Sequence, residues 1–282
     1  DFVCPASVSG IRAGEDEVVV EYTGPGGSGQ ARGALLVGAD GAQSFVRESL
    51  GIEVERHDYR QTAVICNVTP EQDHRGRAFE CFTPSGPFAV MPHVNGRCGL
   101  IWCEDTERAQ ALLELPDGEF LEQARHRFGN HLGAFLKLGR RSSYPLRLVR
   151  AREDIRPRAV ILGNAAHAIH PIGAQGFNLG LRDVAVLAEV LAETVRREGA
   201  SAIGAPATLR RYSAWRAPDQ RGTIAYSDGL ARMFSNPSPV AAAARTVGLL
   251  AHAFIPPLRR QLAVRAMGFR GRIPRLALGE PL

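Results

Sequence analysis

Residues 163–183, GNAAHAIHPIGAQGFNLGLRD, decide how the rest of the chain is interpreted. The apolar run at 159–162, just before them, is too short for a helix and predicts a buried strand. After them, apolar residues recur at helical spacing over 184–195, and Gly199 follows as a stop signal. The pattern therefore predicts a strand, a long glycine-rich loop and a helix that begins near Asn178.

The loop in this stretch has the features of a ligand-binding loop. Pro171 stiffens the turn and gives up its own N–H, and free N–H groups at the start of the following helix carry partial positive charge. A flat, electron-rich ligand that accepts hydrogen bonds and is negative in one state, such as a reduced flavin, suits this loop. A tight structural turn is the alternative. Glycines open the backbone to close approach at Gly163, Gly173, Gly176 and Gly180.

The same stretch resembles the second flavin-binding motif of the class A flavoprotein monooxygenases, the p-hydroxybenzoate hydroxylase-like family. That motif runs G-D-A-A-H, then Pro, then G-x-G-x-N-x-G, then Asp. Here Asn164 takes the place of the usual Asp. The stretch most resembles the ubiquinone-biosynthesis hydroxylase branch, although the order Gly173-Ala174-Gln175 departs from the usual Ala-Gly-Gln.

A second motif lies at residues 35–50, LLVGADGAQSFVRESL. A predicted strand ends at its G-A-D-G, and Ser44 can cap a short helix that follows. The segment resembles the family's G-A-D-G-x-x-S-x-V-R motif at every named position, which implies contact with the phosphates and ribityl chain of FAD. Asp40 is expected to accept hydrogen bonds at the strand end, and Arg47 to meet negative charge. A capped helix with an Asp turn is the alternative.

The resemblance spans almost the whole chain. It implies an α/β, p-hydroxybenzoate hydroxylase-like FAD-binding fold with an inserted α+β substrate domain and C-terminal helices. The family begins with a βαβ unit that carries G-x-G-x-x-G, and nothing before Glu17 supplies it, so we expect an N-terminally incomplete fold. The predicted parts are the end of the FAD-binding domain at 1–57, the substrate-binding sheet domain at 58–150, the FAD loop and helix at 151–200, and a helical region at 201–282.

A literal G-x-G-x-x-G does occur at residues 24–29. A dinucleotide site requires this motif to open a helix, but here a polar link with an internal proline joins predicted strands at 17–22 and 34–37. We therefore interpret it as a hairpin loop.

The middle of the chain has the pattern of a sheet domain. Residues 80–92 resemble the branch's E-x-F-T-x-x-G-P-x-A-x-L-P signature, and Phe82, Phe88 and Met91 either line a pocket for an aromatic substrate or pack in the core. Turn residues separate the predicted strands at 63–68, 78–82, 88–92 and 98–103. Apolar spacing predicts helices over 120–138, 206–235 and 239–268.

The resemblance implies FAD-dependent hydroxylation of a polyprenylated phenol in ubiquinone biosynthesis, with NAD(P)H and O2. Hydroxylation of another aromatic compound and a non-catalytic subunit of a complex are the alternatives. His167 and His170 are weak candidates for a catalytic role, and either can simply hydrogen-bond the loop. The residues expected to bind the cofactor are Asp40, Gly41, Arg47, Gly163, Asn164, Pro171, Gly173, Ala174, Gln175, Gly176, Phe177 and Asn178.

Composition limits the setting and the partners. Five scattered cysteines without a C-x-x-C pair predict reduced thiols in a cytoplasmic protein, and we expect no metal site. The net charge of +5 includes a C-terminal segment rich in arginine, which suits an anionic inner-membrane surface or an acidic partner in a ubiquinone-biosynthesis complex. Nucleic acid is not expected as a partner, because no recognition motif appears. The alternative to any binding role of this segment is a basic face that is simply solvated. These arginines are Arg245, Arg259, Arg260, Arg265, Arg270, Arg272 and Arg275.

Overall fold

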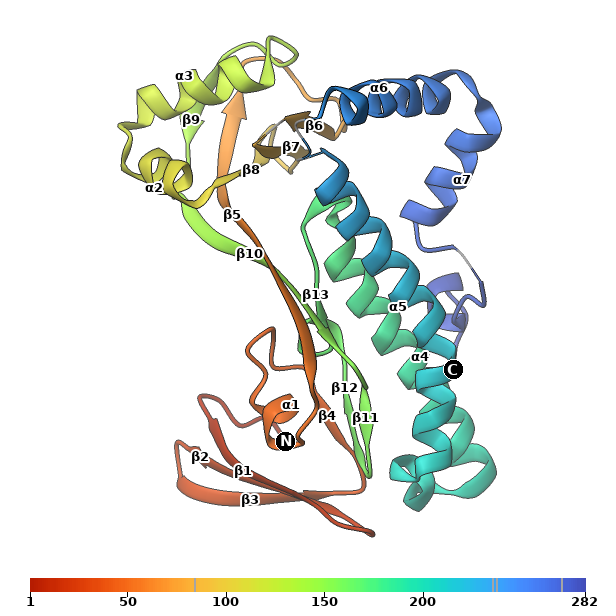
Figure 1. The fold of residues 1–282 in the computed structure, drawn as a ribbon. Coiled ribbons are helices and arrows are strands. Elements are labelled where there is room, and N and C mark those ends of the chain that lie inside the picture. The colour runs from red at the N-terminus through yellow and green to blue at the C-terminus, as the bar shows by residue number, and fades with distance from the viewer. Residues whose placement is uncertain (84, 235, 237, 270) are drawn as a thin grey trace. The chain divides into compact units, whose positions relative to one another are not determined.

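The computed structural model describes residues 1–83, 85–234, 236, 238–269 and 271–282, so Pro84, Ser235 and Arg270 of the sequence predictions lie outside the described residues. The described chain forms two compact units (Figure 1). The first unit contains Asp1–His57, Leu148–Ser227 and Arg259–Leu282, and the second contains Asp58–Arg147 and Asp228–Leu258.

The first unit opens with an antiparallel sheet in the order β1-β2-β3. Gly24 pairs with Gly27 where β2 turns into β3, so the G-x-G-x-x-G lies in a hairpin and opens no helix, as predicted. The strand predicted at 34–37 is present as β4 (Leu36–Gly38), but it pairs with β12 (Ala159–Ile161), and β3 is the partner of β2 in the hairpin. Small and polar residues hid the real partner, because backbone pairing needs no apolar alternation. These strands are β1 (Ser7–Ala13), β2 (Val18–Gly24) and β3 (Gly27–Gly33).

A second small sheet has the order β11-β12-β4. Strand β12 (Ala159–Ile161) is fully buried, which confirms the predicted strand, and it runs parallel to β4 (Leu36–Gly38). Strand β11 (Ile155–Arg156) completes the sheet. Helix α4 (Gln175–Glu198) packs against β12 and ends at Gly199, as predicted.

Helix α4 begins three residues before the predicted start at Asn178. Gly173 and Ala174 both have left-handed backbone angles, with φ of 66° and 52°, and these turn the chain directly into the helix. Asn178 is a residue type favoured at helix caps. In the structure it lies inside the first turn, where its side-chain amide donates to the Ala174 carbonyl.

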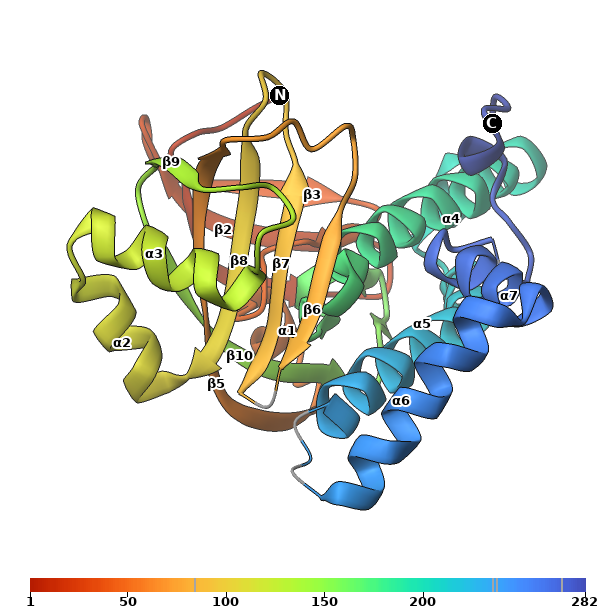
Figure 2. The same cartoon turned by 90° about the horizontal axis from the view of Figure 1, so that it is seen from above.

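The core of the second unit is aromatic. Figure 2 shows α2 and α3 along one face of the strands, and the side chains between them are buried. Phe88 belongs to this core and is fully buried, so it packs rather than lining a pocket. The elements here are β6 (Phe79–Thr83), β7 (Gly86–Pro92), β8 (Cys98–Asp105), α2 (Thr106–Glu114), α3 (Asp117–Phe128) and β9 (Phe135–Leu138), while β5 (Val54–Pro70) and β10 (Ser142–Ala151) run on into the first unit.

The predicted helix over 120–138 was wrong in its second half. Helix α3 ends at Gly129, whose φ of 85° favours glycine, and a second left-handed glycine follows at Gly133. The remaining residues form β9, which pairs with β5. The apolar spacing continued across these two glycines by coincidence, and the glycines decided the outcome.

Two helices were predicted after α4, over 206–235 and 239–268, and the structure has three among its described residues. They are α5 (Pro206–Phe234), α6 (Pro239–Phe254) and α7 (Pro256–Ala266), and the predicted 239–268 helix breaks at Ile255, before two prolines. Within the described residues, no single helix has the length and apolar composition to cross a membrane, and only the bent pair α6 and α7 reaches that threshold together. The short elements are α1 (Phe45–Ser49), β13 (His167–Ala168), and 3-10 turns at Gly163–Ala165, Ile172–Ala174, Ala200–Gly204 and Arg275–Leu278.

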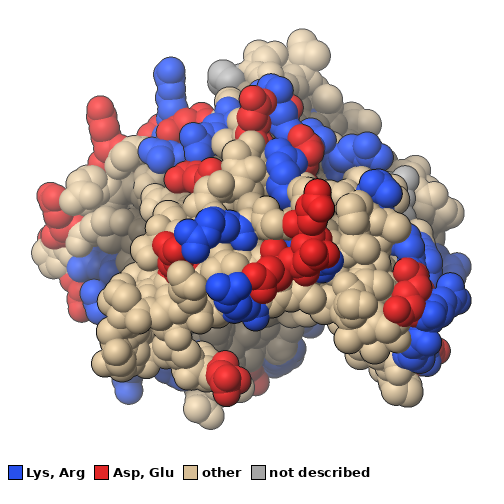
Figure 3. All heavy atoms as spheres, turned by 90° about the horizontal axis from the view of Figure 1, so that it is seen from below, with Lys and Arg blue, Asp and Glu red and all other residues tan. Residues whose placement is uncertain are grey.

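Charged side chains of both signs cover the face drawn in Figure 3. Lysine and arginine lie beside aspartate and glutamate there, so the net charge of +5 does not gather into a single basic patch on this face.

Candidate functional site

The two sequence motifs meet at one edge of the β11-β12-β4 sheet. Strands β4 and β12 are parallel neighbours, and the Leu162 N–H donates to the Gly38 carbonyl at 3.0 Å where both strands end. The carboxyl ends of parallel strands are where open α/β sheets place their ligands. The fold therefore brings together two loops that lie more than 100 residues apart in the sequence.

The loop after β4 is organised by Asp40. Its carboxylate accepts hydrogen bonds from the Ser44 hydroxyl and from the Val46 N–H, and the Ser44 oxygen in turn accepts from the Arg47 N–H at 2.9 Å. Asp40 thus accepts hydrogen bonds at the strand end, as expected, but its donors are the start of α1. Gly41 has a φ of 85°, and a Cβ placed there would meet nothing within 4 Å, so this backbone is open.

Arg47 joins the two loops. Its guanidinium is 1% exposed and donates to the carbonyls of Ala165 and Ala42 at 2.8 and 2.9 Å. Burial lowers the pKa of Arg47 and the nearby positive charge of Arg56 lowers it further, while the negative charges of Glu48 and Asp40 act in the opposite direction. Its Nε has no partner among the described residues. A buried cation that is hydrogen-bonded to carbonyls favours further negative charge nearby.

The loop after β12 lies tightly against α4. Gly163 has a φ of 56°, and a Cβ on Gly180 would lie 3.3 Å from the Gly163 Cα. The two glycines therefore let the helix approach the strand end, which is a packing role that α/β nucleotide-binding folds also give to glycine. Asn164, which follows, is exposed.

The start of α4 presents backbone donors. No side chain caps this helix, so its first N–H groups carry an uncompensated partial positive charge. Phe177 is 76% exposed beside them. Gln175 turns inward, and its amide donates to the carbonyls of Gly173 and Ala266. The structure therefore places Gln175 as a support for the loop, whereas the neighbouring backbone stays open.

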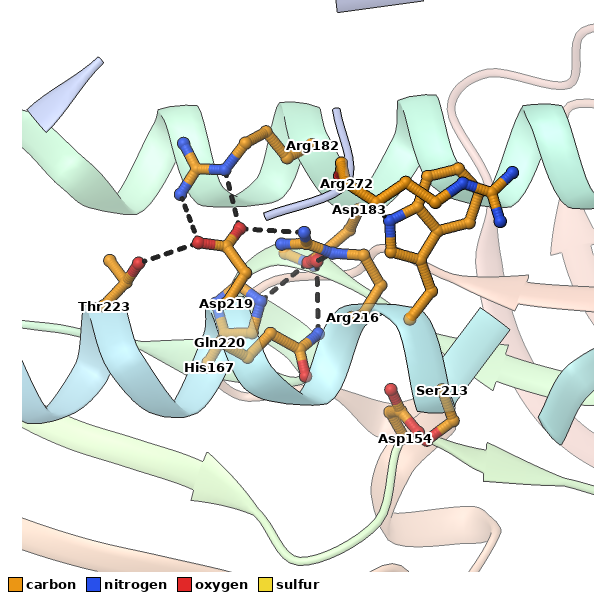
Figure 4. A network of polar contacts seen from close by, with 12 residues as sticks. Asp154, His167, Arg182, Asp183, Ser213, Arg216, Asp219, Gln220, Thr223 and Arg272 are labelled. Carbon is orange, nitrogen blue, oxygen red and sulfur yellow. Dashed lines mark hydrogen bonds and ion pairs between the residues drawn. The ribbon is translucent and has the colours of Figure 1, made fainter. Parts of the chain in front are cut away.

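A buried carboxylate behind the loop holds the arrangement together (Figure 4). Asp183 is fully buried and accepts from the Gly163 N–H at 3.1 Å and from His167 Nε2 at 2.6 Å. Helix α5 adds two donors, Arg216 Nε at 2.8 Å and Gln220 Nε2 at 3.1 Å. Burial alone would raise the pKa of Asp183, but the hydrogen bonds and charges of His167 and Arg216 hold it below its ordinary value.

Arg216 continues this network to a second acid. Its Nη1 donates to Asp219 at 2.8 Å, and Asp219 also accepts from Arg182 Nε at 2.8 Å and from the Thr223 hydroxyl. The sequence prediction missed the network. Its signals were present in Asp183, the acid that closes the flavin motif, and in Arg216, which lies within the helix predicted over 206–235.

The two histidines of the loop differ in their surroundings, but both are buried, at 2% exposure for His167 and 1% for His170. His167 is committed to Asp183, which favours positioning of the loop over contact with a substrate. The carbonyl of His170 accepts from the Ser227 hydroxyl of α5. A catalytic role for either stays a prediction.

These features fit a flavin. Open glycine backbones at Gly41 and Gly163 leave room beside two loops, the first turn of α4 supplies positive charge, and the buried Arg47 lacks an acidic partner among the described residues. Anionic groups bind at such helix starts.

The model of the FAD binding domain family matches residues 6–224. The chain belongs to this FAD-binding family of class A flavoprotein monooxygenases. It is 42% identical to the ubiquinone hydroxylase UbiL of Rhodospirillum rubrum, with 100% of this chain and 65% of the relative covered. It is 32% identical to the 3-demethoxyubiquinol 3-hydroxylase of Escherichia coli, over 84% of this chain and 60% of that protein. The chain thus spans somewhat less than two thirds of these relatives.

The fold comparison agrees with the sequence relatives. The structure of p-nitrophenol 4-monooxygenase PnpA from Pseudomonas putida superposes with a TM-score of 0.76 at 23% identity, covering 95% of this chain and 67% of that one. The predicted p-hydroxybenzoate hydroxylase-like fold of the flavin monooxygenases is confirmed.

Proposed function

We propose that this chain serves the FAD-dependent hydroxylation of a polyprenylated phenol in ubiquinone biosynthesis, with NAD(P)H as reductant and O2 as oxygen source. The observation that carries the proposal is the meeting of two open glycine loops at the ends of β4 and β12. The substrate class comes from the names of the R. rubrum and E. coli relatives.

The chain's own residues would bind and orient the cofactor, which supplies the oxygen-transfer chemistry when bound. The open backbone at Gly41 and the charge of Arg47 suit the phosphate and ribityl part. Gly163 and Asn164 suit the ribityl hydroxyls on the other side. The Asp183 network would keep the Gly163 turn fixed, because its carboxylate holds the Gly163 N–H.

The start of α4 would stabilise negative charge on the bound ring. Within the expected 173–178 stretch, the Ala174 N–H already donates to the Pro171 carbonyl, so the N–H groups of the first turn, Gln175 to Phe177, would be the donors at the positive end of this 24-residue helix. Fixed donors of this kind act without reorganising during the reaction. Pro171 and Ile172 would pack at the reactive edge and exclude water, since Ile172 is buried and Pro171 is half-buried.

Two measurements on the full natural protein that contains this sequence test the proposal. FAD binding is measured by quenching of flavin fluorescence, and turnover by mass spectrometry of a short-chain prenylated phenol, with NADH or NADPH. We expect a product that has gained one oxygen atom, dependent on O2. Tight FAD binding without product would favour the non-catalytic alternative, and failure to bind FAD would contradict the assignment of the loops.

A polyprenylated substrate lies in a membrane, and we propose that α6 and the start of α7 contact an anionic membrane surface. Helix α6 has no buried residue, although its composition is strongly apolar. Exposed arginines Arg259 and Arg260 follow it. A helix of this kind can lie in the membrane interface, and each arginine near an anionic surface adds about 1 kcal/mol. Its largest exposed apolar side chains are Val240, Val247, Leu249, Leu250 and Phe254.

Vesicle co-sedimentation tests this contact. We expect binding to phosphatidylglycerol vesicles that is lost in high salt, because the Debye length falls from about 10 Å at 0.1 M to 3 Å at 1 M. The double variant Arg259→Gln/Arg260→Gln should bind less, and the matched control Arg196→Gln/Arg197→Gln at the exposed end of α4 should not. Equal binding by both variants would contradict the proposal. Association with a ubiquinone-biosynthesis complex stays a prediction.

A further inference from the structure

A cavity lined by several arginines lies in the first unit, beside the Asp183 network. Helices α4 and α5 form one wall, and the end of α7 with described residues that follow it forms the other. The cavity measures about 410 Å³, a size typical of small-molecule sites. We call it the basic cavity; its lining is Arg182, Trp215, Arg216, Pro218, Asp219, Gly222, Thr223, Arg265, Gly268, Gly271, Arg272 and Pro274.

The C-terminal segment is fixed over this cavity at both ends. The Arg265 guanidinium stacks 4.7 Å from the ring of Tyr226, and its Nη2 donates to the Gly222 carbonyl at 3.0 Å. At the other end, Arg272 stacks 3.6 Å from the ring of Trp215, whose Nε1 donates back to the Arg272 carbonyl. These contacts hold two guanidiniums in defined positions, which a mobile surface arginine would lack.

The lining carries an excess of positive charge. It contains four arginines and one acid, Asp219, which gives +4 − 1 = +3. Asp183, Glu189 and Glu193 form ion pairs with Arg216 and Arg272 from outside the lining and balance the rest of this charge. Arg265 forms no ion pair with any described residue, so within the described chain its guanidinium is the one in this lining that no acid contacts.

The guanidiniums also have donors to spare. Four guanidiniums offer about 20 N–H donors, and six hydrogen bonds use them within the described chain. Arg216 is 3% exposed, and its Nη2 has no partner there. An unpaired buried donor on a charged group is costly, so an acceptor other than the described residues would be favoured beside it.

We propose that the basic cavity binds a phosphate monoester. Arginine forks match the oxygens of phosphate in bidentate geometry, and the Thr223 hydroxyl lies among them. The volume exceeds what a bare phosphate ion needs, which leaves room for the group it is esterified to. A soluble phosphomonoester and the headgroup of phosphatidic acid share this chemistry.

Direct binding tests the proposal on the purified chain in a phosphate-free buffer. The probes are inorganic phosphate and glycerol 3-phosphate, observed by broadening of their phosphorus-31 resonances at constant ionic strength. Arg265→Gln removes a guanidinium without leaving an acid unpaired, and we expect it to weaken binding about tenfold. Arg260→Gln, an exposed neighbour outside this lining, should stay within about twofold of the parent chain.

Two further variants protect the test against a folding defect. Thr223→Glu introduces a carboxylate among the arginines and should abolish binding, whereas Arg265→Lys keeps the charge and should weaken binding less than Arg265→Gln does. Circular dichroism identifies the variants that remain folded. The proposal would be overturned if the parent chain broadened the resonance of neither probe. It would also be overturned if folded Arg265→Gln and Thr223→Glu bound the probes as tightly as the parent chain does.

Vesicles distinguish the two sources of the phosphate. Co-sedimentation with phosphatidic acid vesicles that falls in Arg265→Gln but not in Arg196→Gln, at an exposed position outside this lining, identifies a lipid headgroup. Binding of glycerol 3-phosphate without such co-sedimentation identifies a soluble phosphomonoester. Flavin fluorescence, recorded on the same samples, reports whether Arg265→Gln also disturbs the flavin loop, because Gln175 of that loop donates to the carbonyl of the neighbouring Ala266.

Discussion

Each of the two units is stabilised internally by a different kind of interaction. The second unit packs aromatic rings, with Phe88 and Trp102 at 5.3 Å and Phe128 and Phe135 at 5.8 Å between ring centroids. The first unit places a buried carboxylate, Asp183, behind its loops. A loop that must leave its backbone open to a ligand cannot be filled with side chains. Buried hydrogen bonds and charges therefore do there what ring packing does in the sheet.

Removing a ring from the second unit tests the packing side of this comparison. Phe88→Ala should lower the free energy of unfolding by about 3–5 kcal/mol, because it leaves a cavity in a dense core. Urea denaturation measures it, and the matched control Phe254→Ala, at a ring 79% exposed, should change little. FAD affinity of the folded Phe88→Ala variant should stay unchanged, and a large loss would show that the units are not separable in this way.

Replacing the buried carboxylate of Asp183 tests the role of buried charge in the first unit. Asp183→Asn should lower the free energy of unfolding by about 3 kcal/mol, since it leaves the buried Arg216 without one of its acids. It should also weaken FAD binding, because the Gly163 N–H loses its charged acceptor. The control Asp58→Asn removes an exposed ion pair with Arg147 and should cost less than about 1 kcal/mol.

The same variant has a defined pH dependence. The pKa of Asp183 is lowered in the folded state, so its contribution is present above the unfolded pKa of about 4 and is lost as pH falls through the folded pKa. The stability difference between the parent chain and Asp183→Asn should therefore be largest near neutral pH and shrink in acid. A difference that grows on acidification would contradict a charged Asp183.

Gly176→Val separates ligand space from folding. A Cβ at Gly176 would lie 3.6 Å from Ile169, an ordinary contact, so the chain alone tolerates a side chain there. We expect FAD affinity to fall by at least about 100-fold, or 2.7 kcal/mol, with the thermal midpoint nearly unchanged. Gly118→Val, at the start of α3 in the second unit, is the matched control and should leave FAD binding intact. Normal flavin content in Gly176→Val would contradict the assignment of this loop.

Asn164→Asp is the smallest of these changes. Asn164 is exposed at the loop, and Asp is the usual residue of the family motif at this position. FAD affinity should stay within about tenfold, or 1.4 kcal/mol, by fluorescence titration. Complete loss of flavin would show that this chain builds the ribityl side of its site differently.

Local signals in the sequence were enough for the elements that carry the flavin motifs. The short apolar run before Gly163, the stop at Gly199 and the cap at Ser44 each act within a few residues, and all three are found in the structure. The 120–138 helix failed because Gly129 and Gly133 override apolar spacing. The domain boundaries and the flavin contacts stay predictions.

The supporting network could not be found from spacing alone. Asp183 meets Arg216 across 33 residues and Gly163 across 20, and only the packing of α5 on α4 brings the three together. The basic cavity is even harder to find from local patterns, because its arginines come from three helices, α4, α5 and α7, and from the segment after α7.

The hydrogen bond from Gln175 to the Ala266 carbonyl sets an order of events during synthesis. The partner residue lies 91 positions later in the chain. At about 5–20 residues per second, the ribosome adds it on the order of ten seconds after the loop residue. Throughout that interval the nascent flavin loop lacks one of its anchors, so cofactor loading is favoured after translation has passed α7.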